Sequence, residues 1–185
     1  MAKGFTTNGW RGAFALYTDR RLLVILLMGF SSGLPLLLGF STLSYWLSKE
    51  GISLTAVGGL LAASAPYSFK FLWAPLIDHG RLPLFTRLFG RRRGWMLAIQ
   101  ILMAASIVAL GFGDPRESIA YIAAMALIVA TLSASQDIVI DAYRIEILED
   151  HEQGAGAAMT QTVYRFGLLV AGAGAIALAD FVSWL

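Results

Sequence analysis

Four ionisable residues lie within or at the ends of long apolar stretches of this 185-residue sequence. They are Lys70, Asp137, Asp141 and Arg165. Apolar surroundings disfavour the charged form of a carboxylate, so such an aspartate can take up and release a proton as its surroundings change. A lysine or an arginine at similar depth can pair with that carboxylate or with another anion. These residue types therefore suggest proton exchange coupled to the binding of an anion.

Other polar side chains share a helix face with these four, because steps of three or four residues return to the same side of a helix. The sets that this spacing connects are Ser133, Asp137, Asp141 and Arg144; Gln161 and Arg165, with Tyr164 beside them; and Ser64, Tyr67 and Lys70. Ionisable groups inside a bilayer face the protein interior or a water-filled path. We therefore expect the three sets to face the inside of a helical bundle.

Depth and charge assign roles to these residues. Asp137 lies deeper than Asp141 on one stripe, so we expect Asp137, assisted by Asp141, to exchange the proton. The candidates for binding an anionic substrate are Lys70, Arg165, Gln136, Gln161 and Tyr164. In a simpler alternative, Lys70, Arg165 and Asp137 only neutralise one another and hold the bundle together.

The sequence offers little for enzymatic chemistry. It contains no cysteine, so disulfides, thiol catalysis and cysteine metal sites are excluded. His79 and His151 both fall in expected loops without a second ligand at helical spacing, so we expect no metal site. The acidic residues Glu146, Glu149, Asp150 and Glu152 are expected to form a solvated loop. There is no Ser/His/Asp set, P-loop or dinucleotide fingerprint. We expect neither an enzyme nor a cofactor, with the proton as the coupling ion.

Composition indicates an all-α integral membrane protein. Apolar residues make up 57% of the chain, charged residues only 14%, and the mean hydropathy is +0.68. A helix that crosses a bilayer needs roughly 20 mostly apolar residues. Five spans are expected, near residues 22–46, 54–77, 95–113, 118–142 and 157–180. Residues 1–21 precede them as a leader, which could form an interfacial helix through Trp10, Phe14 and Tyr17.

Basic residues predict the orientation, because Lys and Arg in short loops mark the cytoplasmic side. Ten of them fall at the N-terminus, in the second loop and in the fourth loop: Lys3, Arg11, Arg20, Arg21, Arg81, Arg87, Arg91, Arg92, Arg93 and Arg144. The opposite loops hold only Lys49 and Arg116. We expect a cytoplasmic N-terminus. The net charge of +2 comes from loop residues and indicates no nucleic-acid partner.

The junction between the second and third spans carries a motif. It reads Trp73-Ala-Pro-Leu-Ile-Asp78-His79 and, after ten residues, Gly90-Arg91-Arg92-Arg93-Gly94-Trp95. This resembles the signature loop of the major facilitator superfamily, in which an Asp ends the second helix and a Gly-Arg-Arg cluster opens the third. Ala74, His79 and the inserted residues 80–89 depart from that pattern. The resemblance implies a gate motif of Asp78, Arg91, Arg92, Arg93 and Arg144, although plain cytoplasmic orientation explains the arginines equally well.

Two further stretches indicate a particular group of transporters within this superfamily. Gly29-Phe-Ser-Ser-Gly-Leu-Pro35 and Gln136-Asp137-Ile-Val-Ile-Asp141-Ala-Tyr-Arg144 are similar to the AmpG muropeptide permeases, with the eukaryotic acetyl-CoA transporters as more distant relatives. The resemblance implies proton-driven import of anhydro-muropeptides across the bacterial inner membrane, and an indirect role in β-lactamase induction. Peptide carboxylates would suit Lys70 and Arg165, and the amide and phenol side chains would suit sugar and amide groups.

The resembling fold has twelve spans in two six-helix halves. We therefore expect this sequence to be the N-terminal bundle of such a transporter, ending before or within the sixth span, with the C-terminal half as its partner. One alternative is a transporter of another anionic amphiphile, such as an acyl-CoA. Another is a non-transporting membrane scaffold, which needs no second half.

A single cysteine tests the orientation, which places loops 78–94 and 143–156 in the cytoplasm. Because the sequence is free of cysteine, a cysteine at residue 85 would be the only target for a membrane-impermeant maleimide. It should be labelled only after the membrane is permeabilised. Labelling from the periplasmic side of intact cells would reverse the orientation.

Overall fold

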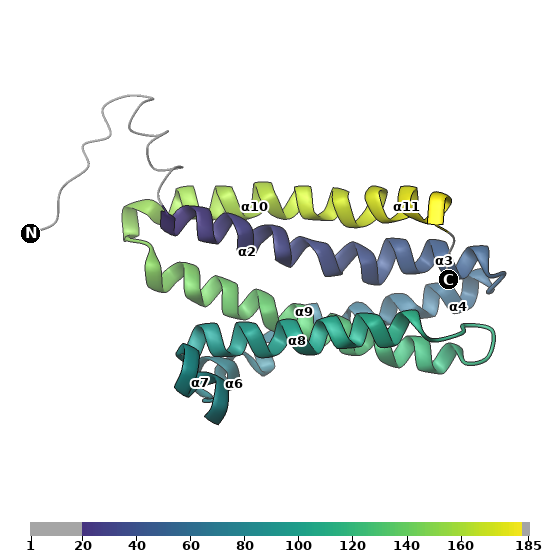
Figure 1. The fold of residues 1–185 in the computed structure, drawn as a ribbon, viewed down its shortest axis with the longest axis horizontal. Coiled ribbons are helices and arrows are strands. Elements are labelled where there is room, and N and C mark those ends of the chain that lie inside the picture. Colours follow the sequence, from purple (N-terminus) through teal and green to yellow (C-terminus); the bar gives the residue numbers. More distant parts are fainter. Residues whose placement is uncertain (1–19, 183–185) are drawn as a thin grey trace, which may run out of the picture.

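The computed structural model describes residues 20–182, and every regular element in that part of the chain is a helix. Figure 1 shows long helical segments lying side by side along one axis. The first traverse comprises α2 (Arg20–Leu37), η1 (Leu38–Thr42) and α3 (Leu43–Lys49). The second comprises α4 (Leu54–Leu60), η2 (Leu61–Ser64), α5 (Ala65–Phe69), η3 (Lys70–Leu72) and α6 (Ala74–His79). The rest comprises α7 (Pro83–Phe89), α8 (Arg91–Gly111), α9 (Ile119–Ile147), η4 (Asp150–Glu152), α10 (Gln153–Leu169), η5 (Val170–Gly174) and α11 (Ala175–Val182).

Four helices within residues 20–182 are long and apolar enough to cross a membrane. They are Arg20–Lys49, Arg91–Gly111, Ile119–Ile147 and Asp150–Leu178. The expectation of an all-α membrane protein is thereby confirmed, with one helix fewer than the five spans expected. The exception is the expected span 54–77. The possible interfacial helix around Trp10 lies outside the described residues.

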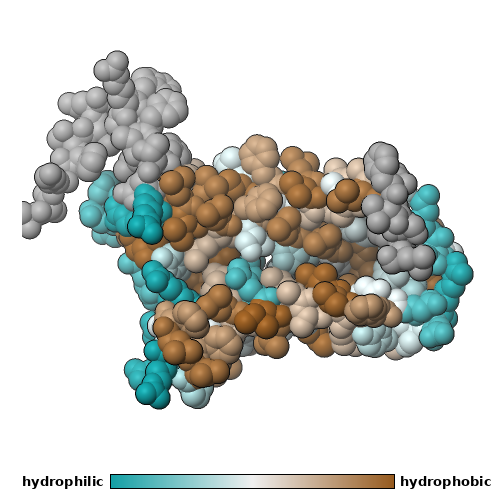
Figure 2. Space-filling view, in the orientation of Figure 1, coloured by the Kyte–Doolittle hydropathy of each residue, from teal (hydrophilic) through white to brown (hydrophobic). Residues whose placement is uncertain are grey.

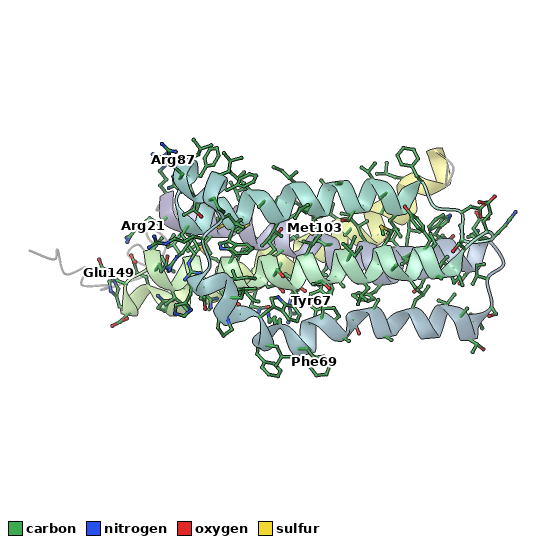
Figure 3. The ribbon with its side chains drawn as sticks, turned by 90° about the horizontal axis from the view of Figure 1, so that it is seen from below. Arg21, Tyr67, Phe69, Arg87, Met103 and Glu149 are labelled. Carbon is green, nitrogen blue, oxygen red and sulfur yellow. The ribbon has the colours of Figure 1, made fainter. Side chains whose placement is uncertain are left out.

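Two prolines explain why the segment 54–77 is not one long helix. Pro66 lies in the first turn of α5 and Pro75 in the first turn of α6. Proline has no N–H to donate, and its ring clashes with the preceding turn, so an α-helix rarely continues through it. The tighter turns η2 and η3 precede the two prolines. The resulting pieces pack in succession along α9, and Figure 3 shows Tyr67 pointing toward the bundle and Phe69 away from it.

Glycines allow α2 and α10 to pack closely, as Figure 1 shows for their full length. A Cβ atom added to Gly29 would lie 2.9 Å from the Val163 side chain and 3.0 Å from the Thr160 carbonyl oxygen. A Cβ atom at Gly33 would overlap the Tyr164 carbonyl group. The two backbones therefore approach with no side chain between them, as small residues permit in membrane helices.

Two π-helical turns face each other across this same pair of traverses. η1 interrupts the first traverse and η5 interrupts the last, and the two turns contact each other. Thr42 Oγ1 donates a hydrogen bond to the Ala171 carbonyl oxygen at 3.0 Å. A π turn holds one residue more than an α turn and occurs mostly as a single widened turn inside an α-helix. Both long helices therefore widen at one level.

The two ends of the bundle are polar and its flanks are apolar. Figure 2 shows a broad apolar band between hydrophilic ends. Figure 3 places Arg21, Arg87 and Glu149 together at one end. The helices also run past the expected spans: α9 continues to Ile147, so Arg144 lies in its last turn and not in the following loop. The expected insertion 80–89 contains the helix α7.

We predict that Gly33→Ala destabilises the bundle, because the added methyl group must displace the Tyr164 backbone of α10. Overpacking of this kind costs about 1–3 kcal/mol. The thermal midpoint of the purified full-length protein in detergent should fall accordingly. Gly39→Ala is the matched control on the same traverse, because a Cβ atom there meets nothing within 4 Å. Equal midpoints for the two variants would contradict the close contact.

Candidate functional site

An ion pair joins the second traverse to α9. Lys70 Nζ, at the start of η3, lies 3.8 Å from Asp137 Oδ2. The side chains are 36% and 18% exposed, respectively. Ser32 Oγ from α2 donates a hydrogen bond to Asp137 Oδ1. One carboxylate thus receives a hydroxyl group and an ammonium group from two other elements.

The break in the second traverse is itself fastened to α9. Trp73 Nε1 donates a hydrogen bond to Ser135 Oγ at 3.0 Å, and Ser135 Oγ donates to the Thr131 carbonyl oxygen one turn earlier. Trp73 is the residue between η3 and α6. The irregular turn that carries Lys70 is therefore held against the helix that carries Asp137.

A cavity of about 230 Å³ opens at this ion pair. Its walls come from α2, η3, α9 and α10, and the lining residues are Ser32, Lys70, Asp137, Ile140, Asp141, Thr160, Gln161 and Tyr164. Five of the residues singled out from the sequence therefore meet in one place: Lys70, Asp137, Asp141, Gln161 and Tyr164. The chemistry available there is a paired carboxylate, a cation and several hydrogen-bonding groups.

Asp141 lies one turn further along α9, in the same cavity, and is more exposed than Asp137. Its Oδ1 atom lies 3.4 Å from Arg144 Nη2, an i,i+3 pair within one helix. The stripe expected along α9 thus runs from the buried Ser133 through Asp137 to the exposed Asp141.

Arg165 does not share the cavity of Lys70. It lines two neighbouring hollows on α10, one with Phe166 and Leu169 and the other with Leu37 and Leu168. Gln161 borders these hollows as well as the cavity. Arg165 is exposed, and the described residues form no ion pair with it. An arginine is thus presented on the open side of a helix long enough to span a membrane.

Gln136 is fully buried and does not line the cavity. Its Nε2 atom donates a hydrogen bond to Ser31 Oγ at 3.3 Å, across the contact between α9 and α2. Sequence reasoning had missed Ser32 and Thr160. Serine and threonine carry no charge, so their presence in an apolar stretch gave no sign that they line a cavity.

A second cluster of charges joins α6, α8 and α9 at one end of the bundle. Arg92 Nη1 lies 2.7 Å from Asp78 Oδ1, and Arg92 Nη2 lies 2.7 Å from Glu146 Oε1. Arg91 Nη2 also reaches Glu146 Oε1, at 3.5 Å. Glu146 was expected in a solvated acidic loop, and this is wrong, because it belongs to the last turns of α9. Of the expected gate motif, the structure joins Asp78, Arg91 and Arg92 through this glutamate.

The other two residues of the expected gate motif lie apart from this cluster. Arg144 pairs with Asp141. Arg93 is exposed, and no ion pair to it is formed by residues 20–182.

A further ion pair at this end, between Arg21 and Glu152, was not expected from the sequence. Arg21 Nη2 lies 2.9 Å from Glu152 Oε1, and Arg21 Nη1 donates to the Ile147 carbonyl oxygen at 3.2 Å. Glu152 is buried and also accepts the Glu149 N–H, closing a capping box before α10. The pair connects the start of α2 to the turn between α9 and α10. The expected solvated loop is therefore wrong for Glu152, which is buried.

Comparison with known proteins places the chain in a family. The family model described as "Acetyl-coenzyme A transporter 1" matches residues 21–121, more than half of the sequence. The chain belongs to the acetyl-coenzyme A transporter 1 family. That match spans α2 to the start of α9 and so includes Lys70 and the Asp78–Arg92 pair.

Three proteins similar to this acetyl-coenzyme A transporter family chain come from bacteria. The anhydromuropeptide permease of Escherichia coli strain K12 is 45% identical over 92% of this chain. An uncharacterised protein of Haemophilus influenzae is 39% identical over 89% of it, and a putative transporter AmpG 4 of Rickettsia conorii is 34% identical over 91%. The resemblance to AmpG permeases is thereby confirmed. The chain spans 33%, 38% and 40% of these relatives' lengths, respectively.

A pair of variants separates a structural role of the Lys70–Asp137 pair from a role in function. Lys70→Met leaves the Asp137 carboxylate without its cation, whereas Lys70→Met with Asp137→Leu removes both charges. Because the pair is partly exposed, we expect the single change to cost about 1–2 kcal/mol. The double variant should recover most of that loss in a thermal unfolding measurement on the full-length protein. Equal losses in the two variants would contradict a direct interaction.

Proposed function

We propose that this chain forms the N-terminal part of a proton-coupled transporter that imports anhydro-muropeptides across the bacterial inner membrane. The printed name of the 45% identical relative supports the substrate. The observation that carries the proposal is the Lys70–Asp137 pair at a cavity between four helical elements. A merely structural ion pair needs no cavity, whereas a transported solute does.

Asp137 is the group we assign to proton coupling. A nearby lysine favours the charged form of a carboxylate. When an incoming anion pairs with the lysine in place of the carboxylate, protonation of the carboxylate is favoured. Substrate binding and proton binding would then support each other through Lys70. Asp141, one turn toward the opening, would pass the proton between Asp137 and water.

Lys70, Gln161 and Tyr164 are the side chains we assign to the substrate. They line one cavity with Asp137, where an ammonium group suits a peptide carboxylate and the amide and phenol groups suit sugar and amide groups. Gln136 was included among the binding residues, but its burial against Ser31 fits a positioning role between α9 and α2.

Arg165 faces outward, and this favours a partner for α10. A charged side chain within a membrane span is costly unless it meets protein or water. Transporters of this kind place the substrate between two repeat halves, which move against each other. We assign the open side of α10 to the C-terminal half of the full-length protein, with Arg165 at the shared substrate cavity.

The cluster of Asp78, Arg92 and Glu146 is a candidate latch. It joins the ends of three helices through charge-assisted hydrogen bonds of 2.7 Å, and such bonds are among the stronger polar contacts. A cytoplasmic N-terminus places the cluster on the inner side of the membrane, where it would stabilise one state of the gate. The arginines would then serve both orientation and gating.

Uptake of labelled anhydro-muropeptide tests the proposal. Vesicles with the full-length protein should accumulate substrate when a proton gradient is applied. Asp137→Asn should abolish this accumulation and leave counterflow exchange measurable, because exchange needs no net proton movement. Lys70→Ala and Arg165→Ala should each raise the half-saturating concentration about tenfold, the loss of one charged hydrogen bond. Residues 1–185 alone, with one wall of the cavity, should give no uptake above empty vesicles.

The same vesicles distinguish the rival functions. Uptake of acetyl-CoA in place of the muropeptide would favour the second candidate substrate, which the description of the family model supports. Normal accumulation by Asp137→Asn would move the proton site elsewhere. No uptake of either compound by vesicles with the full-length protein would favour a non-transporting membrane scaffold.

A further inference from the structure

The inserted segment between α6 and α8 folds as a defined helix with an uncovered apolar face. Pro83 starts α7, the Leu82 N–H donates to Thr86 Oγ1 at 2.9 Å, and Gly90 ends the helix at φ +81°. Leu84 and Leu88, four residues apart and hence on one face, are 67% and 65% exposed, and Phe89 beside them is also exposed. This face therefore does not contribute to the core of the bundle.

Close packing fixes α7 against α8. A Cβ atom added to Gly94 would lie 2.9 Å from the Phe85 carbonyl group, so the two backbones touch. Trp95 Nε1 also donates to the Gly80 carbonyl oxygen at 3.0 Å, which holds the start of the same loop. The uncovered face of α7 is thus presented in one direction by a rigid support.

Exposed arginines lie within α7 and on both sides of it in the sequence. Arg81 precedes α7, Arg87 lies within it and Arg93 follows it, and all three are exposed. Among residues 20–182 no acidic group forms an ion pair with any of the three, whereas the neighbouring Arg92 has two acidic partners. Figure 2 shows an apolar patch bordered by hydrophilic residues at the end of the molecule where Figure 1 places α6 and α7.

We propose that α7 lies in the headgroup region of the cytoplasmic leaflet and, with Arg81, Arg87 and Arg93, binds anionic phospholipid. An apolar face beside basic residues is the pattern of helices that lie in this region. Anionic lipids attract basic segments next to a membrane span. These three arginines have no acidic partner in the part of the chain that the structure describes, and their charge suits the phosphate headgroups of anionic lipids. The proposal rests on the cytoplasmic N-terminus used in the proposed function, but not on the substrate proposed there.

Lipid titration of the full-length protein tests the charges. Dioleoylphosphatidylglycerol added to detergent-purified protein should raise the thermal midpoint more than dioleoylphosphatidylcholine does. Arg87→Gln should weaken the phosphatidylglycerol affinity about fivefold, and a variant with all three arginines changed to glutamine should abolish the preference. Arg116→Gln is the matched control, since this exposed arginine lies in the loop at the other end of the bundle. An unchanged preference in the triple variant would overturn the proposal.

A depth measurement tests the apolar face independently of the arginines. A spin label on Leu88→Cys, in vesicles that contain phosphatidylglycerol, should be accessible to oxygen and shielded from a water-soluble nickel complex. Pro83→Cys, on the other side of the same helix, is the matched control and should show the reverse. Equal water accessibility at both positions would overturn the proposal. Disulfide-linked dimers through Leu88→Cys would also overturn it, since a second copy would then cover the face.

Discussion

Every charge placed within apolar surroundings has to be compensated by the protein itself, and the Asp137 carboxylate imposes this condition on the whole bundle. Its partners come from α2 and η3, so three separate traverses must meet at one point. An unpaired carboxylate among apolar side chains would be costly. The packing of α2, the break before α6 and the length of α9 together bring these partners to the Asp137 carboxylate.

Glycines and prolines position the partners of Asp137 in different ways: glycines allow close helix packing, and prolines interrupt a helix. Gly29 and Gly33 bring α2 against α10 with almost no space between the backbones, which leaves the other side of α2 for Ser32 and α9. Pro66 and Pro75 interrupt hydrogen bonding in the second traverse, and Lys70 starts the short turn between them. A regular helix would instead have kept Lys70 on a continuous 3.6-residue stripe.

The sequence predicts the parts of the site that depend on charged residues within apolar stretches, because such residues stand out in the sequence. Lys70, Asp137 and Asp141 meet as expected, because burial of charge leaves few arrangements. Arg165 shows the limit: it was expected to bind the substrate together with Lys70, yet it lines hollows beside the cavity of Lys70 and not that cavity itself. The rotation of a helix depends on packing that one sequence does not reveal. Glu146 was expected in a loop and lies in α9, because a charged helix end and a charged loop have the same composition. The second traverse was expected as one span, since hydropathy does not register a missing N–H group.

The paired π turns have a consequence for sequence length. In each of η1 and η5 one extra residue is absorbed by a widened turn. Beyond each turn, the pattern of inward-facing residues therefore resumes one position later than an unbroken α-helix would place it, a difference of about 100° around the helix axis. A relative that lacks one residue at 38–42 or 170–174 can close the widened turn and keep the same faces in contact. Elsewhere in these helices, a one-residue deletion would rotate all that follows.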